Sequence, residues 1–284
     1  MTTYAVTGAT GHLGALVVEN LIERGVPAAD VVAVVRTPSK AEALVTRGAT
    51  VREGDYSRPE TLPAALAGVD VLLLVSGSEV GQRVAQHGAV IDAAVAAGVG
   101  RIVYTSVLRA DTTPLVLAPE HKATEELLRA SGIPFTILRN GWYTENYTGR
   151  IGEYLSRGVI VGAAGDGRVA AATRADYAAA AVEALVGDGH AGAVYELAGA
   201  PFTLKELAAE IAAATGTEVV YSDVTVAELV GILQGAGLDE GTAGFVAALD
   251  EATARGDLDA SDADLTRLIG RPATLLADAV RAAV

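Results

Sequence analysis

The chain has 284 residues and a formal net charge of −14, from 21 Lys and Arg against 35 Asp and Glu. A surface of this sign repels phosphate backbones, which excludes general nucleic-acid binding. The absence of cysteine excludes disulfides, thiolate catalysis and cysteine-bound zinc or iron–sulfur clusters.

Membrane and metal proteins are also disfavoured. No apolar run reaches the ~18 residues that a membrane helix needs, and Met1 leads into the first predicted strand without a signal-peptide pattern. We therefore expect a cytoplasmic protein with no membrane partner. The four histidines (positions 12, 87, 121 and 190) have no metal-ligand spacing, so no metal site is predicted.

Short apolar runs alternate with helical patterns through the first half of the chain. The runs predicted as strands are Tyr4–Thr7, Val31–Val35, Thr50–Arg52, Val71–Val75, Arg101–Thr105 and Phe135–Leu138. They are nearly continuous in apolar or β-branched residues, as expected for a parallel sheet covered on both faces. Helices are predicted between them at Leu13–Arg24, Val80–Ala97 and Pro119–Ala130. This alternation predicts an α/β fold with a doubly wound parallel sheet of the Rossmann type.

The pattern changes after Asn140, which divides the chain into two predicted lobes. Residues 1–140 should form a dinucleotide-binding lobe, and residues 141–284 mainly a smaller C-terminal substrate lobe. A strand near 193–198, in "AVYELAG", is expected to return to the sheet. Helices are predicted at "ATRADYAAAAVEALV", at "FTLKELAAEIAAATG" and over most of the chain after Val226. The second of these opens with a capping box, Thr203 and Glu206, and one more strand is predicted at Val219–Val224.

Three glycines follow the first strand in "AVTGATGHLG". A strand, a glycine loop and a helix are the context of a dinucleotide site. There Gly8 allows the sharp turn, Gly11 lets a pyrophosphate approach the backbone, and Gly14 lets the helix pack on the sheet. The unpaired N–H groups of the helix then face the phosphates. The spacing G-x-x-G-x-x-G is that of extended and atypical short-chain dehydrogenase/reductases, and in this context it predicts cofactor binding rather than a plain turn.

Arg36 ends the second strand in "VVAVVRTPSK". NAD-dependent enzymes usually place an acidic residue there, whereas an arginine suits the 2′-phosphate of NADPH. The alternative is that Arg36 is a solvated residue at a strand end, and Lys40 is interpreted as a surface residue.

The catalytic Tyr-x-x-x-Lys pair of short-chain reductases is absent. In "LAPEHKATEELL" Lys122 is present, but Ala118 stands four residues earlier, and His121 is the only conventional acid or base nearby. This disfavours a substrate that needs a strong protein acid and favours an acceptor that takes a hydride readily.

Several segments together carry a family resemblance. These are "AVTGATGHLG", "LLLVSGSEVGQR", "YTSVLRADTTPL", "LRNGWYTENY", "GAAGDGRVAAATRADYAAAA", "VYELAG" and "LIGRPATLLADAV". Over nearly the whole chain the sequence resembles the NmrA-like atypical short-chain dehydrogenase/reductases, in particular their quinone-reducing branch. The resemblance implies NADPH bound between the lobes and direct hydride transfer to a small-molecule quinone.

The resemblance also implies a set of site residues. Those that would bind the cofactor are Gly8, Ala9, Thr10, Gly11, His12, Leu13, Arg36, Ser76, Gly77, Ser78, Asn140, Gly141, Trp142, Tyr143 and Arg174. The quinone pocket would be formed by Trp142, Tyr143, Asn146 and Tyr147, because a flat acceptor needs stacking surfaces and a few polar groups. The alternative is that these aromatic residues only pack the two lobes together.

Two other functions share these motifs. One is an NADP-binding redox sensor that acts through partner proteins without turnover. The other is an atypical reductase of another acceptor, such as a dye or an imine. The sequence predicts neither the oligomeric state nor the physiological acceptor.

Overall fold

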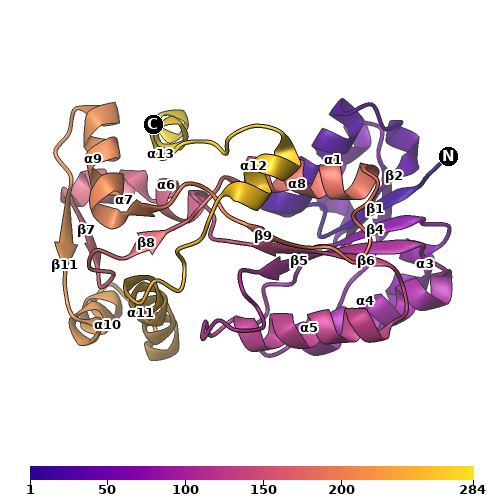
Figure 1. Ribbon diagram of the computed structural model, residues 1–284, viewed down its shortest axis with the longest axis horizontal. Helices are drawn as coiled ribbons and strands as arrows, with labels where there is room; N and C mark the ends of the chain where they lie inside the picture. The colour runs from indigo at the N-terminus through magenta and orange to yellow at the C-terminus, as the bar shows by residue number, and fades with distance from the viewer.

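A seven-stranded parallel sheet forms the centre of the larger of two lobes in the computed structural model, which describes residues 1–284 (Figure 1). The strand order is β3-β2-β1-β4-β5-β6-β9. The strands are β1 (Tyr4–Thr7), β2 (Val31–Val35), β3 (Thr50–Glu53), β4 (Val71–Leu74), β5 (Arg101–Val107), β6 (Phe135–Asn140) and β9 (Val194–Leu197). The predicted doubly wound parallel sheet is therefore confirmed.

Helices cover both faces of this sheet. On one face lie α1 (His12–Glu23), α8 (Arg174–Val186) and α12 (Ala263–Ile269), and on the other α3 (Leu62–Leu66), α4 (Arg83–Ala97) and α5 (Ala118–Ala130). The connections add η1 (Ala28–Asp30), η2 (Pro38–Lys40), α2 (Glu42–Thr46) and η3 (Pro59–Thr61). In β2 the side chains on both faces are buried: Val31 and Ala33 belong to the core on the α1 side, and Val32 to the core on the α4 side. The strand is therefore apolar at every position.

The smaller lobe is built from short strands and helices. Its elements are α6 (Glu145–Thr148), α7 (Ile151–Arg157), β7 (Val159–Gly162), β8 (Arg168–Val169), β10 (Phe202–Thr203), α9 (Leu204–Thr215), β11 (Val220–Asp223), α10 (Val226–Gly235), α11 (Glu240–Ala254) and α13 (Leu276–Ala283). The predicted capping box is present at α9, where the Glu206 N–H donates to Thr203 Oγ1 at 3.1 Å. No helix of the protein is both long and apolar enough to span a membrane.

Several predicted elements differ in detail. The strand predicted at Val219–Val224 is β11 (Val220–Asp223), which pairs with β7 inside the smaller lobe. Strand β5 ends at Val107, two residues past its predicted end. Strand β6 continues two residues past the predicted end, since Arg139 and Asn140 keep their register with β5 despite their polarity. Helix α4 begins at Arg83, three residues later than predicted.

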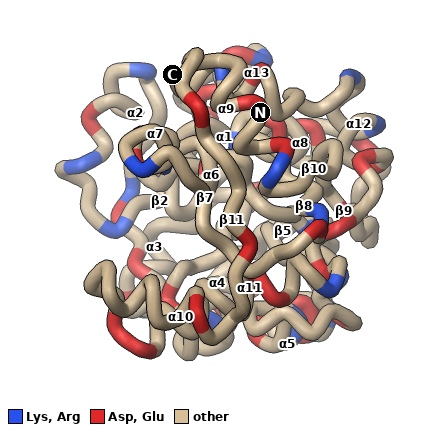
Figure 2. The backbone as a smooth tube through the Cα atoms, turned by 90° about the vertical axis from the view of Figure 1, so that its left-hand side faces the viewer, with Lys and Arg blue, Asp and Glu red and all other residues tan.

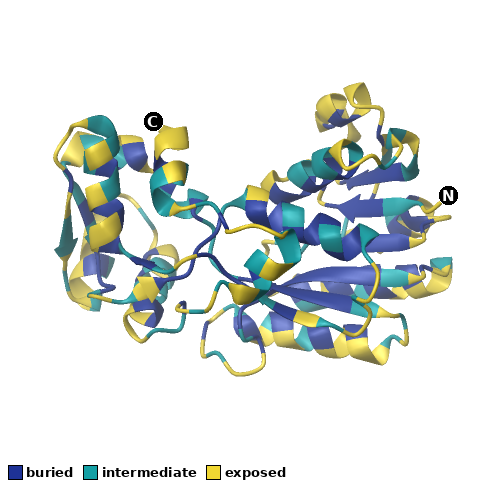
Figure 3. Cartoon of the chain, turned by 45° about the horizontal axis from the view of Figure 1, so that its top comes forward, coloured by how far each residue is buried: buried dark blue, intermediate teal, exposed yellow.

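The two lobes are joined by several hydrogen-bonded chain crossings. The Ala172 N–H donates to the Trp142 carbonyl at 3.1 Å, and the Thr144 N–H donates to the Ala172 carbonyl at 3.0 Å. At a third crossing, a Cβ on Gly199 would lie 2.1 Å from the Ala171 carbonyl oxygen, so only glycine fits. Buried segments accordingly continue from the sheet across the junction (Figure 3). The segment after β6 is therefore fixed by both lobes.

Helix α1 packs directly on the loop that follows β1. A Cβ on Gly14 would lie 2.4 Å from the Gly8 carbonyl oxygen and 2.9 Å from the Ala9 Cα atom. The sequence predicted that Gly14 would bring the helix close to the sheet; the tightest contact is with the glycine loop itself.

We predict that Gly14→Ala destabilises the fold although it raises helix propensity. Overpacking against a backbone atom typically costs about 1–3 kcal/mol. The matched control is Gly231→Ala in α10, where a Cβ would meet nothing within 4 Å. This substitution should raise the free energy of unfolding by roughly 0.5–1 kcal/mol. Chemical denaturation of both variants measures the difference; equal stabilisation of the two would contradict the close packing.

Candidate cofactor and acceptor site

The predicted site residues follow strands that end at one edge of the sheet. Because the strands are parallel, the loops after β2, β1, β4 and β6 all lie at their carboxyl ends, in that order. Helices α1 and α4 leave this edge toward opposite faces of the sheet, so β1 and β4 form the switch point where doubly wound folds bind ligands. From β2 to β6 the row is about 19 Å long, at ~4.8 Å per strand.

The glycine loop ends in an open helix N-terminus. Gly8 has φ +59°, the left-handed region that favours glycine. The Gly11 N–H donates back to the Gly8 carbonyl at 2.8 Å, and Gly11 is the N-cap of α1 without any side-chain cap. The N–H groups of residues 12–14 have no acceptor in the chain. Such groups, together with the helix dipole, fit an anion such as a pyrophosphate.

Four of the loop's predicted residues are exposed at this edge: Gly8, Thr10, Gly11 and His12. Ala9 and Leu13 are instead buried in the core on the α1 side of the sheet. The side chains of Ala9 and Leu13 therefore hold the loop on the sheet, and only their backbone is available to a ligand.

Arg36 lies at the next position along the row and is exposed. Its Nη1 atom is 3.4 Å from Glu79 Oε1, an ion pair between the loops after β2 and β4. Lys40, which follows four residues later in the chain, is exposed as well. Glu79 was not among the residues singled out from the sequence, because nothing in "SGSEVG" indicates that its carboxylate reaches Arg36.

The loop after β4 is held from its buried side. The Ser76 N–H donates to Thr105 Oγ1 at 2.9 Å, and the Gly77 N–H donates to His87 Nε2 at 2.9 Å. Arg83 Nε donates to the Gly77 carbonyl at 3.0 Å. Ser78, by contrast, is exposed. A buried polar network thus sets the position of this predicted cofactor loop, and no local pattern in the sequence indicates these contacts.

The two histidines beneath this edge are neutral at physiological pH. Burial, with a smaller effect of the nearby Arg83 charge, lowers the pKa of His87 to about 3 and that of His121 to about 3. His87 Nε2 accepts from Gly77, and His121 Nδ1 lies 2.7 Å from the Tyr104 hydroxyl. Lys122 is exposed on α5. Neither His121 nor Lys122 forms a Tyr-Lys type of acid pair.

Buried polar residues fill the carboxyl ends of β5 and β6. Arg139 Nε and Nη2 donate to the two oxygens of Glu125 at 2.9 and 2.7 Å. The Ser106 hydroxyl donates to Glu125 Oε1 at 2.7 Å. These groups satisfy one another, so they position the strand ends and do not present free donors to a ligand.

Arg174 contacts two other predicted site residues, Tyr143 and Asn146. Its guanidinium carbon lies 4.5 Å from the centre of the Tyr143 ring, and Nη2 donates to Asn146 Oδ1 at 3.3 Å. Glu145 completes the group, since its Oε1 accepts the Arg174 N–H at 2.8 Å. Burial raises the pKa of the Tyr143 hydroxyl above its ordinary value. This cluster joins α6 to the start of α8 and offers a cation held flat on an aromatic ring.

Trp142 and Tyr147 lie apart from that cluster and pack on the core of the smaller lobe. The Tyr147 ring makes an edge contact with Phe202 at 5.8 Å between ring centres. The predicted aromatic pocket is therefore divided: Tyr143 packs against the core of the larger lobe, and the other two aromatic residues against the smaller one.

Asn140 ends β6 between these groups and is 5% exposed. Its Oδ1 atom is buried and has no hydrogen-bond partner in the chain. The next residue is tightly packed, because a Cβ on Gly141 would lie 3.0 Å from both Leu108 Cδ1 and the Tyr177 hydroxyl. A buried acceptor without a donor is costly, so it suits a ligand that brings an N–H or O–H group.

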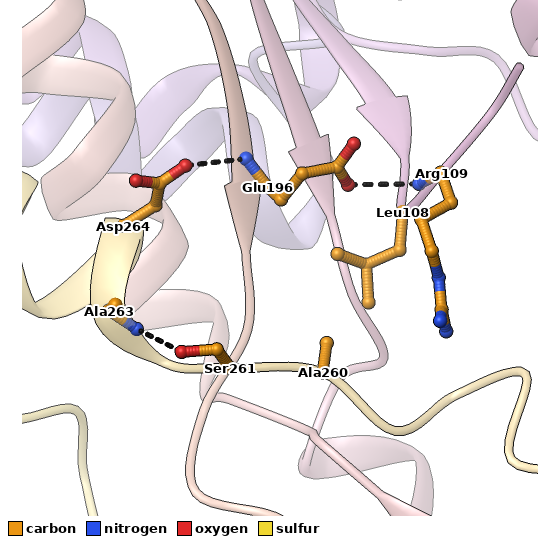
Figure 4. A pocket seen from close by; sticks show the side chains of 7 residues that line it. All are labelled: Leu108, Arg109, Glu196, Ala260, Ser261, Ala263 and Asp264. Carbon is orange, nitrogen blue, oxygen red and sulfur yellow. Dashed lines mark hydrogen bonds between the residues drawn. The ribbon is translucent and has the colours of Figure 1, made fainter.

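A separate cavity of about 360 Å³ lies between the end of β5, strand β9 and the start of α12 (Figure 4). It is lined by Leu108, Arg109, Glu196, Ala260, Ser261, Ala263 and Asp264. Its main polar groups bind one another: the Arg109 N–H donates to Glu196 Oε2 at 2.9 Å, and the Glu196 N–H donates to Asp264 Oδ2 at 3.1 Å. None of the predicted site residues lines it.

Charges of both signs are mixed on the side of the smaller lobe. Basic residues are scattered among acidic ones when the protein is viewed from the smaller lobe, with no continuous basic face (Figure 2). No group of three or more potential metal ligands occurs in the chain.

Comparison with known proteins identifies the family of the chain. The profile of the NAD(P)H-binding family matches residues 8–187. Quinone oxidoreductase 2 of Escherichia coli is 51% identical over 97% of this chain and 96% of its own. The chain belongs to the NmrA-like, NAD(P)H-binding reductase family. The structure of the E. coli enzyme complexed with NADPH matches with a TM-score of 0.94 at 50% identity, covering 98% of each chain.

Members of the family named for other acceptors are also similar. The NAD(P)H azoreductase of Xenophilus azovorans is 32% identical over 98% of this chain and 96% of its own. The Citrobacter sp. triphenylmethane reductase complexed with NADP(H) has a TM-score of 0.94 at 39% identity, over 99% of this chain and all of its own. The family therefore includes reductases named for quinones and for dyes.

We predict that acid weakens the fold partly through His87 and His121. Between pH ~6.5 and ~3 the unfolded chain binds a proton at each histidine and the folded chain does not, so the free energy of unfolding falls as pH falls. Each histidine adds a slope of up to ~1.4 kcal/mol per pH unit. His87→Gln/His121→Gln, which keeps hydrogen-bonding groups, should unfold with a shallower pH dependence in urea titrations from pH 7 to 4. Identical slopes for the two proteins would mean that these histidines are not buried as neutral groups.

Proposed function

We propose that the protein reduces quinones by two electrons with NADPH, and that the row from Arg36 to Tyr143 binds the cofactor. The relative that is 51% identical over nearly the whole chain is named quinone oxidoreductase 2, and its structure holds NADPH. The single observation on this chain that carries the proposal is the open N-terminus of α1 behind the glycine loop, at the switch point of the sheet.

We assign the residues along the row to successive parts of NADPH. The backbone from Gly8 to Leu13 would hold the pyrophosphate, and the Arg36 guanidinium the 2′-phosphate through paired charge-assisted bonds. Residues 76–78 would pass along the middle of the cofactor. The bound cofactor supplies a hydride.

The acceptor end is assigned to the segment that both lobes fix. Asn140 Oδ1 would accept a hydrogen bond from the cofactor's carboxamide. Tyr143, carrying Arg174 on its ring, would hold the nicotinamide end, and Asn146 would supply polar contacts to the quinone. Trp142 and Tyr147 would bound the pocket from the smaller lobe.

Residues 1–140 with β9 would therefore act as the cofactor lobe, and the remaining part of 141–284 as the acceptor lobe.

No protein acid is assigned to the reaction. His121 is buried and neutral, and Lys122 is exposed on α5. Since a quinone takes a hydride readily, the residues need only bind and orient the reactants, and the proton comes from solvent.

The test is turnover of NADPH with benzoquinone by the purified protein and by Arg36→Asp. The unmodified protein should prefer NADPH to NADH in kcat/KM by about 10-fold, the lower range for a charge-assisted bond at an exposed site. Arg36→Asp should reverse the preference, because a carboxylate repels the 2′-phosphate and accepts from a free 2′-hydroxyl.

Arg281→Asp is the matched control, since it makes the same charge change on α13 at an exposed arginine. It should leave the preference unchanged. Tight NADPH binding without quinone turnover would instead identify a sensor, and turnover of a triphenylmethane or azo dye alone would identify a dye reductase. Equal use of NADH and NADPH by the unmodified protein would remove Arg36 from the site.

A further inference from the structure

Arg36, the exposed cation at the end of β2, has an acidic neighbour in Glu79. Arg36 Nη1 lies 3.4 Å from Glu79 Oε1, and the two side chains are 70% and 48% exposed. Since β1 lies between β2 and β4, this ion pair passes across the carboxyl end of β1, where the glycine loop begins. A carboxylate thus sits beside the group that would receive a 2′-phosphate.

The Glu79 carboxylate is held in place from the other side. Its Oε2 accepts a hydrogen bond from Gln86 Nε2 at 2.7 Å, and Gln86, which is 8% exposed, also donates to Ser57 Oγ at 3.0 Å. Gln86 belongs to α4, so the carboxylate is fixed between a helix of the core and Arg36. The bond to Gln86 therefore keeps the Glu79 carboxylate close to Arg36.

The backbone that carries Glu79 is also anchored on both sides. The Gly77 N–H is bound by His87, and the Gly81 N–H donates to Glu120 Oε1 at 2.9 Å. Glu120 in turn accepts from the buried Arg83 at 2.8 Å. A flexible surface loop would let the glutamate swing away from an arriving anion, whereas these bonds keep it at the row.

We propose that Glu79 is a second cofactor-selecting residue, which opposes the 2′-phosphate of NADPH at Arg36 and accepts a hydrogen bond from the free 2′-hydroxyl of NADH. This rests on the proposed placement of the adenosine ribose beside Arg36. The chemistry is that of the acidic residue that NAD-dependent folds carry at the end of β2, supplied here from the loop after β4. The pair Arg36 and Glu79 therefore limits the preference for NADPH and keeps NADH usable.

The test is equilibrium binding of NADPH and of NADH, measured by fluorescence titration, to the unmodified protein and to Glu79→Gln. Glutamine keeps the shape and can still hydrogen-bond, but it removes the negative charge. The affinity ratio in favour of NADPH should rise about 5- to 30-fold, because two like charges near 4 Å repel even in water and the phosphate carries nearly two charges.

Glu218→Gln is the control, since it makes the same charge change at an exposed glutamate of the smaller lobe, before β11. An unchanged ratio in Glu79→Gln, or an equal change in the control, would overturn the assignment. A second comparison asks whether Glu79 acts on the ribose directly or only through its ion pair with Arg36. The NADPH-to-NADH affinity ratio of Arg36→Met/Glu79→Gln is compared with that of Arg36→Met. A higher ratio in the double variant supports direct contact of Glu79 with the ribose, and an equal ratio contradicts it.

The binding assay also separates this inference from the proposed activity. A protein that binds both cofactors and responds at Glu79, but reduces no quinone, would keep the selecting role and lose the quinone-reductase function. A protein that binds neither cofactor would overturn both.

Discussion

The close approach of helix α1 to the glycine loop is the constraint on which the rest of the site depends. Gly14 lies against the Gly8 carbonyl, with no room for a side chain, and this brings the first N–H groups of the helix to the edge of the sheet without acceptors. Partial positive charge is thereby fixed at the switch point. In a chain of net charge −14, that fixed polarity and Arg36 are what attract an anionic cofactor, whereas the protein as a whole repels it.

The other parts of the row take their positions from buried polar bonds. The loop after β4 is held by His87 and Arg83, and the end of β6 by Arg139 bound to Glu125. Burial of these groups is tolerated because each has a partner. Asn140 Oδ1 and, five residues further on, Glu145 Oε2 are instead buried without a hydrogen-bond partner, near the point where the two lobes meet. These two free acceptors are the local feature that best suits the donors of a ligand.

The parallel sheet and the glycine loop were predictable, because they depend on local apolar runs and on a motif whose context lies within one βαβ unit. The strand order came from the structure, since it depends on contacts between strands far apart in the chain. The place of Arg36 at the end of β2 could be predicted from the sequence. Its ion pair with Glu79 could not, because the two residues lie in different loops and are 43 residues apart in the chain. The aromatic run 142–147 looked like one pocket, yet the backbone crossing at Ala172 turns Tyr143 toward the larger lobe and Trp142 toward the smaller one. Strands of two to four residues in the smaller lobe, such as β8 and β10, are too short to show a period.

Amide hydrogen exchange of the whole protein, with and without NADPH, shows whether the cofactor lies along the carboxyl edge from β2 to β6. We predict slower exchange in the segments 8–14, 76–81 and 140–147, where backbone groups at the edge would become bound or covered. Protection confined to 108–109 and 260–264, around the separate cavity, or no protection in the glycine loop, would contradict it.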